Sequence, residues 1–331
     1  MTQSIAILVA AGLAIYFASE FFVNGIEWLG RKLGVSETAT GTLLAALGTA
    51  LPESVITFVA LALGDDPQDV DIGVGAALGG PLALSTIAYA VVGASMLSRA
   101  SQRHIKSRTE KADNRWLTRV QIWFLAIFAL KIGLGVVHFP HKAATGILFI
   151  IVYAWFCVSE FSAGERSASQ DLNPLRIQPK AAEPSLFWVL VQTLGSLLVV
   201  FIASHMFVDR LGDVAIGFGL APGAVALFLS PVATELPEVM NAVIWVRQGK
   251  RRLALANISG AMMVQATVPT AFGLLFSPWM LDRIALYSAA ATALAIAGLL
   301  FVFRTGRANG WVLVQTIWLY IAFVAAVIWL D

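Results

Sequence analysis

The stretch Gly48-Thr49-Ala50-Leu51-Pro52-Glu53 occurs a second time, in altered form, as Ala233-Thr234-Glu235-Leu236-Pro237-Glu238. Thr, Leu, Pro and Glu keep the same spacing in both copies. The match extends without a gap from residues 22–56 to residues 207–241, at a constant offset of 185. A similarity at a fixed offset is the signature of an internal repeat. The chain therefore consists of two related halves.

The composition around this repeat is that of a membrane protein. Of the 331 residues, 58% are hydrophobic and 13% are charged, whereas soluble domains carry about 25% charged residues. A water-soluble globule and a disordered chain are therefore excluded. The net charge of +2 predicts no nucleic-acid partner. The single cysteine, Cys157, excludes a disulfide framework and a cysteine-based metal cluster, and we expect no resident cofactor.

Ten apolar runs are long enough to cross a membrane, which takes about 20 residues. They are residues 4–29, 37–63, 72–98, 116–138, 144–161, 185–208, 221–246, 253–276, 281–303 and 311–330. We therefore expect an all-α integral membrane protein with ten transmembrane helices. Pro52 and Pro237 lie in the middle of the second and seventh runs. Because proline removes a backbone donor, these two helices are expected to be broken.

The order of these runs predicts an inverted repeat. Residues 1–161 form the first half with five spans, residues 162–184 a polar cytoplasmic linker, and residues 185–331 the second half with five spans. Five is an odd number, so the second half enters the membrane from the opposite side. Transporters with inverted repeats bind their substrate near the middle of the membrane, on interrupted helices.

The basic residues predict the orientation of the chain. With the N-terminus outside, 18 of the 22 Lys and Arg residues fall on the cytoplasmic side, and Lys131 lies within a span. The positive-inside rule then predicts external N- and C-termini and large cytoplasmic basic loops, in the plasma (inner) membrane. Membrane lipids surround the chain, and the sequence contains no signal for an oligomeric state.

The repeated motif supplies the candidate site. An ionisable residue in the middle of a membrane is costly and indicates a function, and the repeat places Glu53 and Glu238 at equivalent depths. Two carboxylates, the hydroxyls of Thr49 and Thr234, and carbonyls freed by proline offer only oxygen atoms. Such ligands suit hard cations such as Ca²⁺. The structural alternative is a pair of protonated glutamates that hydrogen-bond within the helix bundle.

These residues resemble the two α-repeats of the calcium/cation antiporter superfamily, the family of sodium/calcium exchangers. The resemblance rests on Val23–Glu37 followed by Gly48–Glu53, and on Ala233–Glu238. The chain is similar to a divergent, bacterial-type member with ten spans and an external N-terminus. The resemblance implies that Glu53 and Glu238 are the central Ca²⁺ ligands, and that Thr49 and Thr234 offer backbone carbonyls.

The sequence departs from the family pattern at the sodium-binding positions. The stretches that follow the two motifs read Gly75–Pro81 and Ala256–Met262, with Gln265 where a carboxylate or amide is common. Positions that hold sodium ligands in the family are occupied here by side chains without oxygen: Ala50, Gly80, Leu84 and Ala261. The classical sodium sites are thus altered, while the motif glutamates are kept.

Glu235 replaces the serine that usually follows the second threonine, three positions before Glu238. On a helix, this spacing places both carboxylates on one face. A third carboxylate near Glu53 and Glu238 favours proton binding by one of the three. We therefore expect export of Ca²⁺ or another divalent cation in exchange for H⁺ or Na⁺, and we favour protons over sodium. The expected metal-site residues are Glu53, Glu238, Thr49, Thr234, Glu235 and Gln265.

Other functions remain as alternatives. A monovalent cation/proton antiporter would use the same fold, and a passive cation channel is a further interpretation. An intramembrane enzyme lacks the necessary residues, because Ser204 and His205 are adjacent and therefore point in different directions. Among the other polar residues, Glu20 lies either on a pathway or at a solvated helix end, and Glu27 is expected at the interface. Trp245, Trp279 and Trp311 are expected in an aromatic belt.

Overall fold

All regular secondary structure is helical within the residues that the computed structural model describes, which are 2–62, 67–98, 114–138, 141–163, 172–219, 228 and 230–330. Eight of its helical segments are long and apolar enough to cross a membrane: Thr2–Leu33, Gly73–Leu97, Arg115–Val136, Lys142–Ser162, Leu186–Leu211, Arg251–Phe276, Arg283–Arg304 and Gly310–Trp329. Each coincides with one of the ten expected runs. The all-α membrane fold is therefore confirmed, while the count of ten spans in two inverted repeats stays a prediction.

The first half contains α1 (Thr2–Leu33), α2 (Glu37–Ala39), the π-helix η1 (Thr40–Ala45) and α3 (Ala46–Ala62). It continues with α4 (Pro67–Ala83), the π-helix η2 (Leu84–Ala88), α5 (Tyr89–Leu97), α7 (Asn114–Val136), the 3₁₀-helix η3 (Lys142–Ala144) and α8 (Thr145–Ala163). The second half contains α9 (Leu186–Gly217), α11 (Ser230–Thr234), α12 (Leu236–Arg247), α13 (Arg251–Phe276), α14 (Arg283–Arg304), α15 (Gly310–Val314) and α16 (Ile317–Leu330).

The two remaining runs of the sequence are the two that were expected to be broken, and the structure divides both into shorter helices. In the second half the break lies at the motif, between α11 and α12. In the first half the predicted position of the break is wrong, because α3 continues through Pro52. The irregular segment there is η1, which ends before the motif. The second half has two prolines, Pro231 and Pro237, where the first has Ala46 and Pro52. A single proline removes one backbone hydrogen bond, whereas two confine the chain between them to a short helix.

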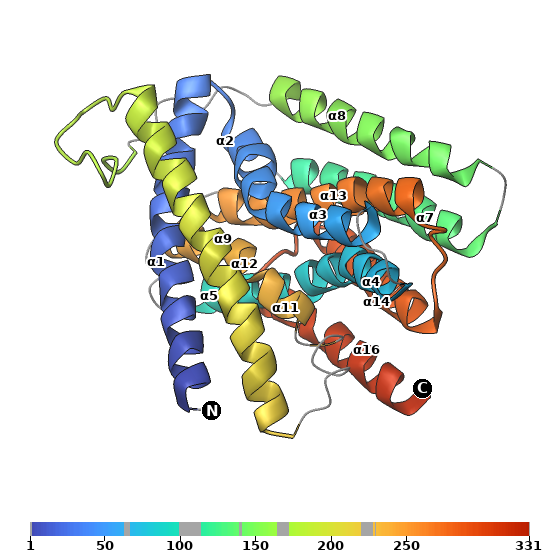
Figure 1. Ribbon diagram of the computed structural model, residues 1–331. Helices are drawn as coiled ribbons and strands as arrows, with labels where there is room; N and C mark the ends of the chain where they lie inside the picture. The colour runs from blue at the N-terminus through green and yellow to red at the C-terminus, as the bar shows by residue number, and fades with distance from the viewer. Residues whose placement is uncertain are drawn as a thin grey trace.

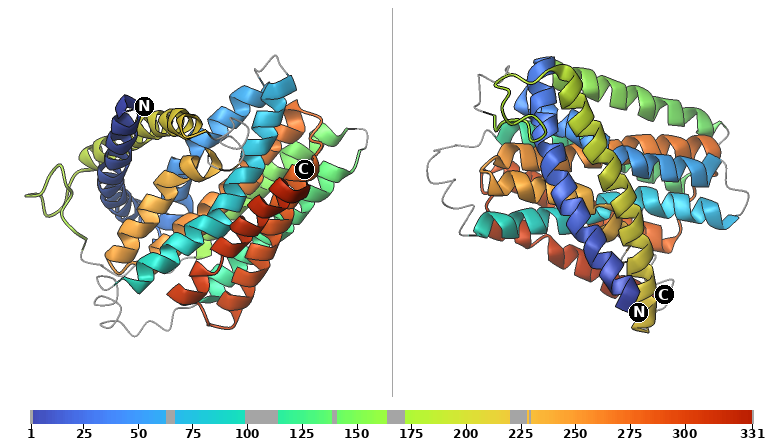
Figure 2. Two further views of the ribbon diagram at one scale, coloured as in Figure 1. Left: turned by 90° about the horizontal axis from the view of Figure 1, so that it is seen from below. Right: turned by 60° about the vertical axis from the view of Figure 1, so that its left-hand side comes forward.

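Two long helices form a pair at one side of the molecule (Figure 1). α1 and α9 have 32 residues each, run in opposite directions and pack more extensively on each other than any other two helices of the described residues. The remaining helices lie together beside this pair (Figure 2). Within this larger group, α13 is buried along most of its length and packs against α3, α4, α7, α8 and α12. The helices that contain both motifs thus meet at α13.

The linker between the halves is docked on the α1–α9 pair. The side-chain amide of Asn24 donates to the carbonyl oxygens of Asn173 and Pro174, each at 3.3 Å, and Trp28 Nε1 donates to Asn173 O at 2.9 Å. Arg176 forms an ion pair with Glu20 at 2.9 Å. Glu20 therefore holds the linker to α1, at a partly exposed position.

Glu27, which the sequence predicts at the membrane interface, is not exposed but forms part of a buried clamp. Its carboxylate accepts a hydrogen bond from Trp245 Nε1 at 2.8 Å and one from Lys250 Nζ at 2.5 Å. Glu27 and Trp245 are both buried. The difference arises because α12 and the turn after it cover this end of α1, which supplies partners from residues far away in the sequence. The clamp joins the α1–α9 pair to the helix that contains the second motif.

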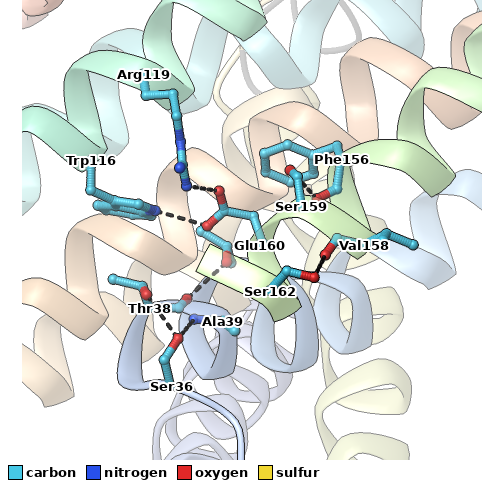
Figure 3. A network of polar contacts seen from close by, with 11 residues as sticks. Ser36, Thr38, Ala39, Trp116, Arg119, Phe156, Val158, Ser159, Glu160 and Ser162 are labelled. Atoms are coloured by element: carbon cyan, nitrogen blue, oxygen red, sulfur yellow. Dashed lines mark hydrogen bonds and ion pairs between the residues drawn. The ribbon is translucent and has the colours of Figure 1, made fainter. Parts of the chain in front are cut away.

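A second polar cluster connects the start of α2 with α7 and α8 (Figure 3). Glu160 of α8 is buried and accepts hydrogen bonds from Trp116 Nε1 at 2.8 Å and Arg119 Nη2 at 2.5 Å. Close by, Ser36 Oγ caps α2 by accepting a hydrogen bond from Ala39 N at 3.1 Å. Side-chain capping at this position fixes where the helix begins. The chain therefore enters η1 and α3 from a defined point.

Candidate cation-binding site

The second motif lies at the break between α11 and α12. Glu235 separates the two helices, with φ −82° and ψ 2°, and Pro237 lies in the first turn of α12. At that position a missing N–H costs no helical hydrogen bond. Glu235 and Glu238 therefore stand on either side of the start of α12, and each is only 1% exposed. Two carboxyl groups at this depth need polar partners or a cation nearby.

One partner of Glu235 comes from α13. Gln265 Nε2 donates a hydrogen bond to Glu235 Oε1 at 2.5 Å, and both side chains are buried. The structure thus brings together two of the residues that the sequence predicted for the site. A side chain that accepts in this way is fixed in direction, so the Glu235 carboxylate is aimed at α13 rather than at lipid.

The wall opposite this pair is a glycine of α4. A Cβ atom built on Gly80 would lie 2.4 Å from Gln265 Oε1 and 2.7 Å from Glu235 Oε1, and one on Gly79 would lie 2.8 Å from Pro231 Cγ. No side chain fits at these positions without displacing its neighbours. Gly80 therefore contributes no side-chain ligand to the site. The space beside α4 that a side chain would fill is occupied by the Glu235 carboxylate and the Gln265 amide.

The threonines and Glu238 are also placed by backbone contacts. Thr49 Oγ1 donates to Ala45 O and Thr234 Oγ1 donates to Pro231 O, each at 3.1 Å. Glu238 offers its carbonyl oxygen to Asn257 Nδ2 at 3.1 Å. A hydroxyl that donates to the backbone keeps lone pairs that can coordinate a cation. Glu53 belongs to α3, and its side chain lies outside the part of the structure that is described.

Two asparagines that the sequence reasoning did not select lie next to the site. Asn241 of α12 is 0% exposed, and neither atom of its amide has a hydrogen-bond partner within the described residues. Asn257 of α13 is equally buried, and its Oδ1 has no hydrogen-bond partner there either. Asn241 follows Glu238 by three positions and so shares its helix face. This three-residue spacing is the feature of the sequence that could have identified Asn241 as a site residue. Buried polar atoms of this kind indicate a place for water or an ion.

The described residues contain no group of three His, Cys, Asp or Glu side chains placed to hold a metal ion together. The oxygen atoms that the described residues place near the break in the second half are of mixed origin. They come from carboxylates, amides, hydroxyls and the backbone. Such a mixture is the usual coordination shell of a hard cation.

Comparison with known proteins identifies the class. The family model described as "Sodium/calcium exchanger protein" matches residues 3–161 and 188–329, so the chain belongs to the sodium/calcium exchanger family. Among its relatives, CaxA of Alkalimonas amylolytica, named as a putative antiporter, is 25% identical over 289 residues, which cover 86% of this chain and 84% of that protein. The inner membrane protein YrbG of Escherichia coli (strain K12) is 21% identical over 310 residues, covering 93% and 90%.

A solved structure of the sodium-calcium exchanger NCX_Mj shares the fold. It superposes with a TM-score of 0.74 over 98% of each chain, at 18% sequence identity. Together with the family match, this makes the chain a multi-pass membrane protein of the exchanger class. It is a cation antiporter and not an enzyme. Proteins of this family transport inorganic cations such as Na⁺ and Ca²⁺.

Proposed function

We propose that the protein exchanges Ca²⁺, or another divalent cation, for protons by alternating access. Glu53, Glu238, Glu235, Gln265, Thr49 and Thr234 supply the site, and the cation is the cargo rather than a resident cofactor. The observation that supports this most directly is the Glu235 carboxylate, buried at the helix break and hydrogen-bonded to Gln265. With Glu53 and Glu238 it brings the number of motif carboxylates to three.

The count of charges favours a divalent cation with proton exchange. Two carboxylates balance one divalent cation, and the third is left over. A carboxylate near other negative charges in a low dielectric favours binding a proton. Sodium exchange would need additional oxygen ligands, but a side chain on Gly80 would displace Gln265 and Glu235. Ala50, Leu84 and Ala261 have no side-chain oxygen. Exchange of a monovalent cation for protons by the same site is the second candidate.

Ion flux in proteoliposomes tests this proposal. We expect uptake of radioactive Ca²⁺ into vesicles that contain the purified protein to be driven by an imposed pH gradient and to be indifferent to a Na⁺ gradient. In the Glu235→Gln variant we expect the dependence on the pH gradient to be lost, because the extra titratable carboxylate is gone. Uptake driven by Na⁺ alone contradicts proton exchange. An unchanged pH dependence in Glu235→Gln shows that another residue binds the proton.

The proposed orientation places both termini outside the cell, and the linker and the 99–115 loop in the cytoplasm, in a plasma (inner) membrane. Residues 99–113 of that loop lie outside the described residues. We expect Ala182→Cys in the linker to resist a membrane-impermeant thiol reagent in intact cells, in a Cys157→Ala background. His138→Cys, between α7 and η3, is the matched external position. Both residues are exposed in the structure. Labelling of residue 182 from outside would reverse the orientation.

A further inference from the structure

A lysine that the proposed transport site does not use is buried inside the helix bundle. Lys131 of α7 is 0% exposed, and its Nζ donates a hydrogen bond to the carbonyl oxygen of Ala77 in α4 at 2.7 Å. Among the described residues no carboxylate lies within ion-pair distance of it. The faces of Phe128 and Trp279 lie 5.5 Å and 5.8 Å from the ammonium nitrogen. Aromatic faces and a carbonyl therefore surround this cation.

The carbonyl that Lys131 contacts has lost its usual hydrogen bond within the helix. Pro81 lies four residues after Ala77, in the interior of α4. In an α-helix the oxygen of Ala77 would accept the N–H of residue 81, and proline has none. A buried carbonyl without a partner destabilises the fold, by an amount comparable to a lost hydrogen bond. The Lys131 ammonium supplies the hydrogen bond that Pro81 removes.

The turn between Ala77 and Pro81 is also the turn that forms one wall of the proposed site. It contains Gly80, which faces the oxygen atoms of Glu235 and Gln265 at the distances given above. It also contains Gly79, which lies against Pro231 of α11. A small shift of this turn therefore either opens a gap beside Glu235 or presses α4 into it. Its geometry depends on what satisfies the carbonyl of Ala77.

We propose that Lys131 is a positioning residue for the cation site. Its ammonium replaces the backbone hydrogen bond lost at Pro81 and thereby holds the Gly79–Gly80 segment of α4 against Glu235 and Gln265. Lys131 does not bind the transported cation itself. This inference rests on the proposed function, because it assigns the positioned groups to a cation site.

A double-mutant cycle tests the inference with four proteins: the wild type, Lys131→Met, Pro81→Ala and the double variant. Met keeps the length of the side chain but donates no hydrogen bond, and Pro81→Ala restores the N–H that the Ala77 carbonyl lacks. We expect Lys131→Met to raise the KM for Ca²⁺ about tenfold when Pro81 is present and less than about threefold in the Pro81→Ala background. A residue that only fills space would give the same ratio in both backgrounds.

Lys142→Met is the matched control. Lys142 is also a buried lysine that donates to backbone carbonyls, those of Val137 and Trp279 at 3.0 Å and 2.9 Å, in connecting segments outside the proposed site. Because the Trp279 ring lies over Lys131, this variant also measures any effect that reaches Lys131 through Trp279 and does not depend on Pro81. We expect Lys142→Met to leave the KM for Ca²⁺ unchanged and to lower the stability equally with and without Pro81→Ala. Lys131→Arg, which keeps a donor, is expected to retain most of the affinity.

Each result of these measurements either supports or overturns the role of Lys131. An unchanged KM in Lys131→Met, or an equal increase in both backgrounds, overturns the inference. If Lys131→Met does not fold, recovery of folding in the double variant supports the inference and its failure there overturns it. If the wild type transports no divalent cation, the proposed function fails. Thermal unfolding of the same four proteins then still tests whether Lys131 and Pro81 are coupled.

Discussion

Glu238→Gln and Glu53→Gln are each expected to abolish divalent-cation transport while the protein remains folded in the membrane. A divalent ion that has lost its water needs formal negative charge close by, and an amide keeps the oxygen but not the charge. Removing one partner from a buried pair of charges costs about 3–5 kcal/mol. At about 1.4 kcal/mol for each factor of ten, the apparent affinity falls by about a hundredfold or more. Uptake of radioactive Ca²⁺ into proteoliposomes and the Ca²⁺-induced shift in melting temperature measure the loss.

Glu160→Gln controls for the removal of a buried carboxylate elsewhere. Glu160 and Glu238 are both buried, at 2% and 1% exposure. The partners of Glu160 are Trp116 and Arg119 of α7, in the polar cluster near the start of α2. We expect this variant to melt at a lower temperature and to keep the wild-type affinity for Ca²⁺. Transport of a divalent cation by Glu238→Gln at a near-normal rate would show that the paired motif glutamates do not form the site.

Gly80→Val is expected to reduce transport by about tenfold or more, through a steric effect. Its side chain would begin 2.4 Å from Gln265 Oε1 and 2.7 Å from Glu235 Oε1. Either the Glu235–Gln265 hydrogen bond breaks or α4 moves away from α13, and overpacking of this kind costs about 1–3 kcal/mol. Initial rates of Ca²⁺ uptake over a range of Ca²⁺ concentrations separate a loss of affinity from a loss of turnover.

Gly75→Val is the control on the same helix, because a Cβ atom there meets no atom of the described residues within 4 Å. It makes the same change in helix propensity and is expected to leave the rate of transport unaltered. Equal losses in the two variants would mean that α4 as a whole, rather than contact with Glu235 and Gln265, limits transport.

Much of the architecture was predictable from the chain alone because lipid limits the choices. Backbone groups inside a membrane must be satisfied within each segment, so long apolar runs become helices. Eight of the runs coincide with helical segments long enough to cross a membrane, and the described parts of the two runs that contain the motifs form shorter helices. The interruption in the first half was placed wrongly, since α3 continues through Pro52. One proline removes a single backbone hydrogen bond and leaves α3 continuous, whereas the second half has Pro231 as well as Pro237 around its break.

The partners of the buried polar side chains were not predictable. Trp279 was expected in an aromatic belt, but it is 0% exposed, and its Nε1 donates to Lys131 O at 3.1 Å. Trp245 is likewise buried, against Glu27, whereas Trp311 is exposed as a belt residue should be. All three lie near the ends of apolar runs. A hydropathy pattern cannot distinguish them, because it reports the depth of a residue and not which helix covers it.

The class of protein and the position of the candidate site could both be predicted from the chain alone, because the repeated Thr-x-Leu-Pro-Glu motif is local and charge in a membrane is costly. The folded structure was needed to show that Glu235 pairs with Gln265, that Gly80 forms the wall beside them, and that Lys131 satisfies the carbonyl freed by Pro81. These contacts join residues 30 to 185 positions apart. They follow from how helices pack, which depends on the shapes of all the neighbouring side chains at once rather than on any local pattern.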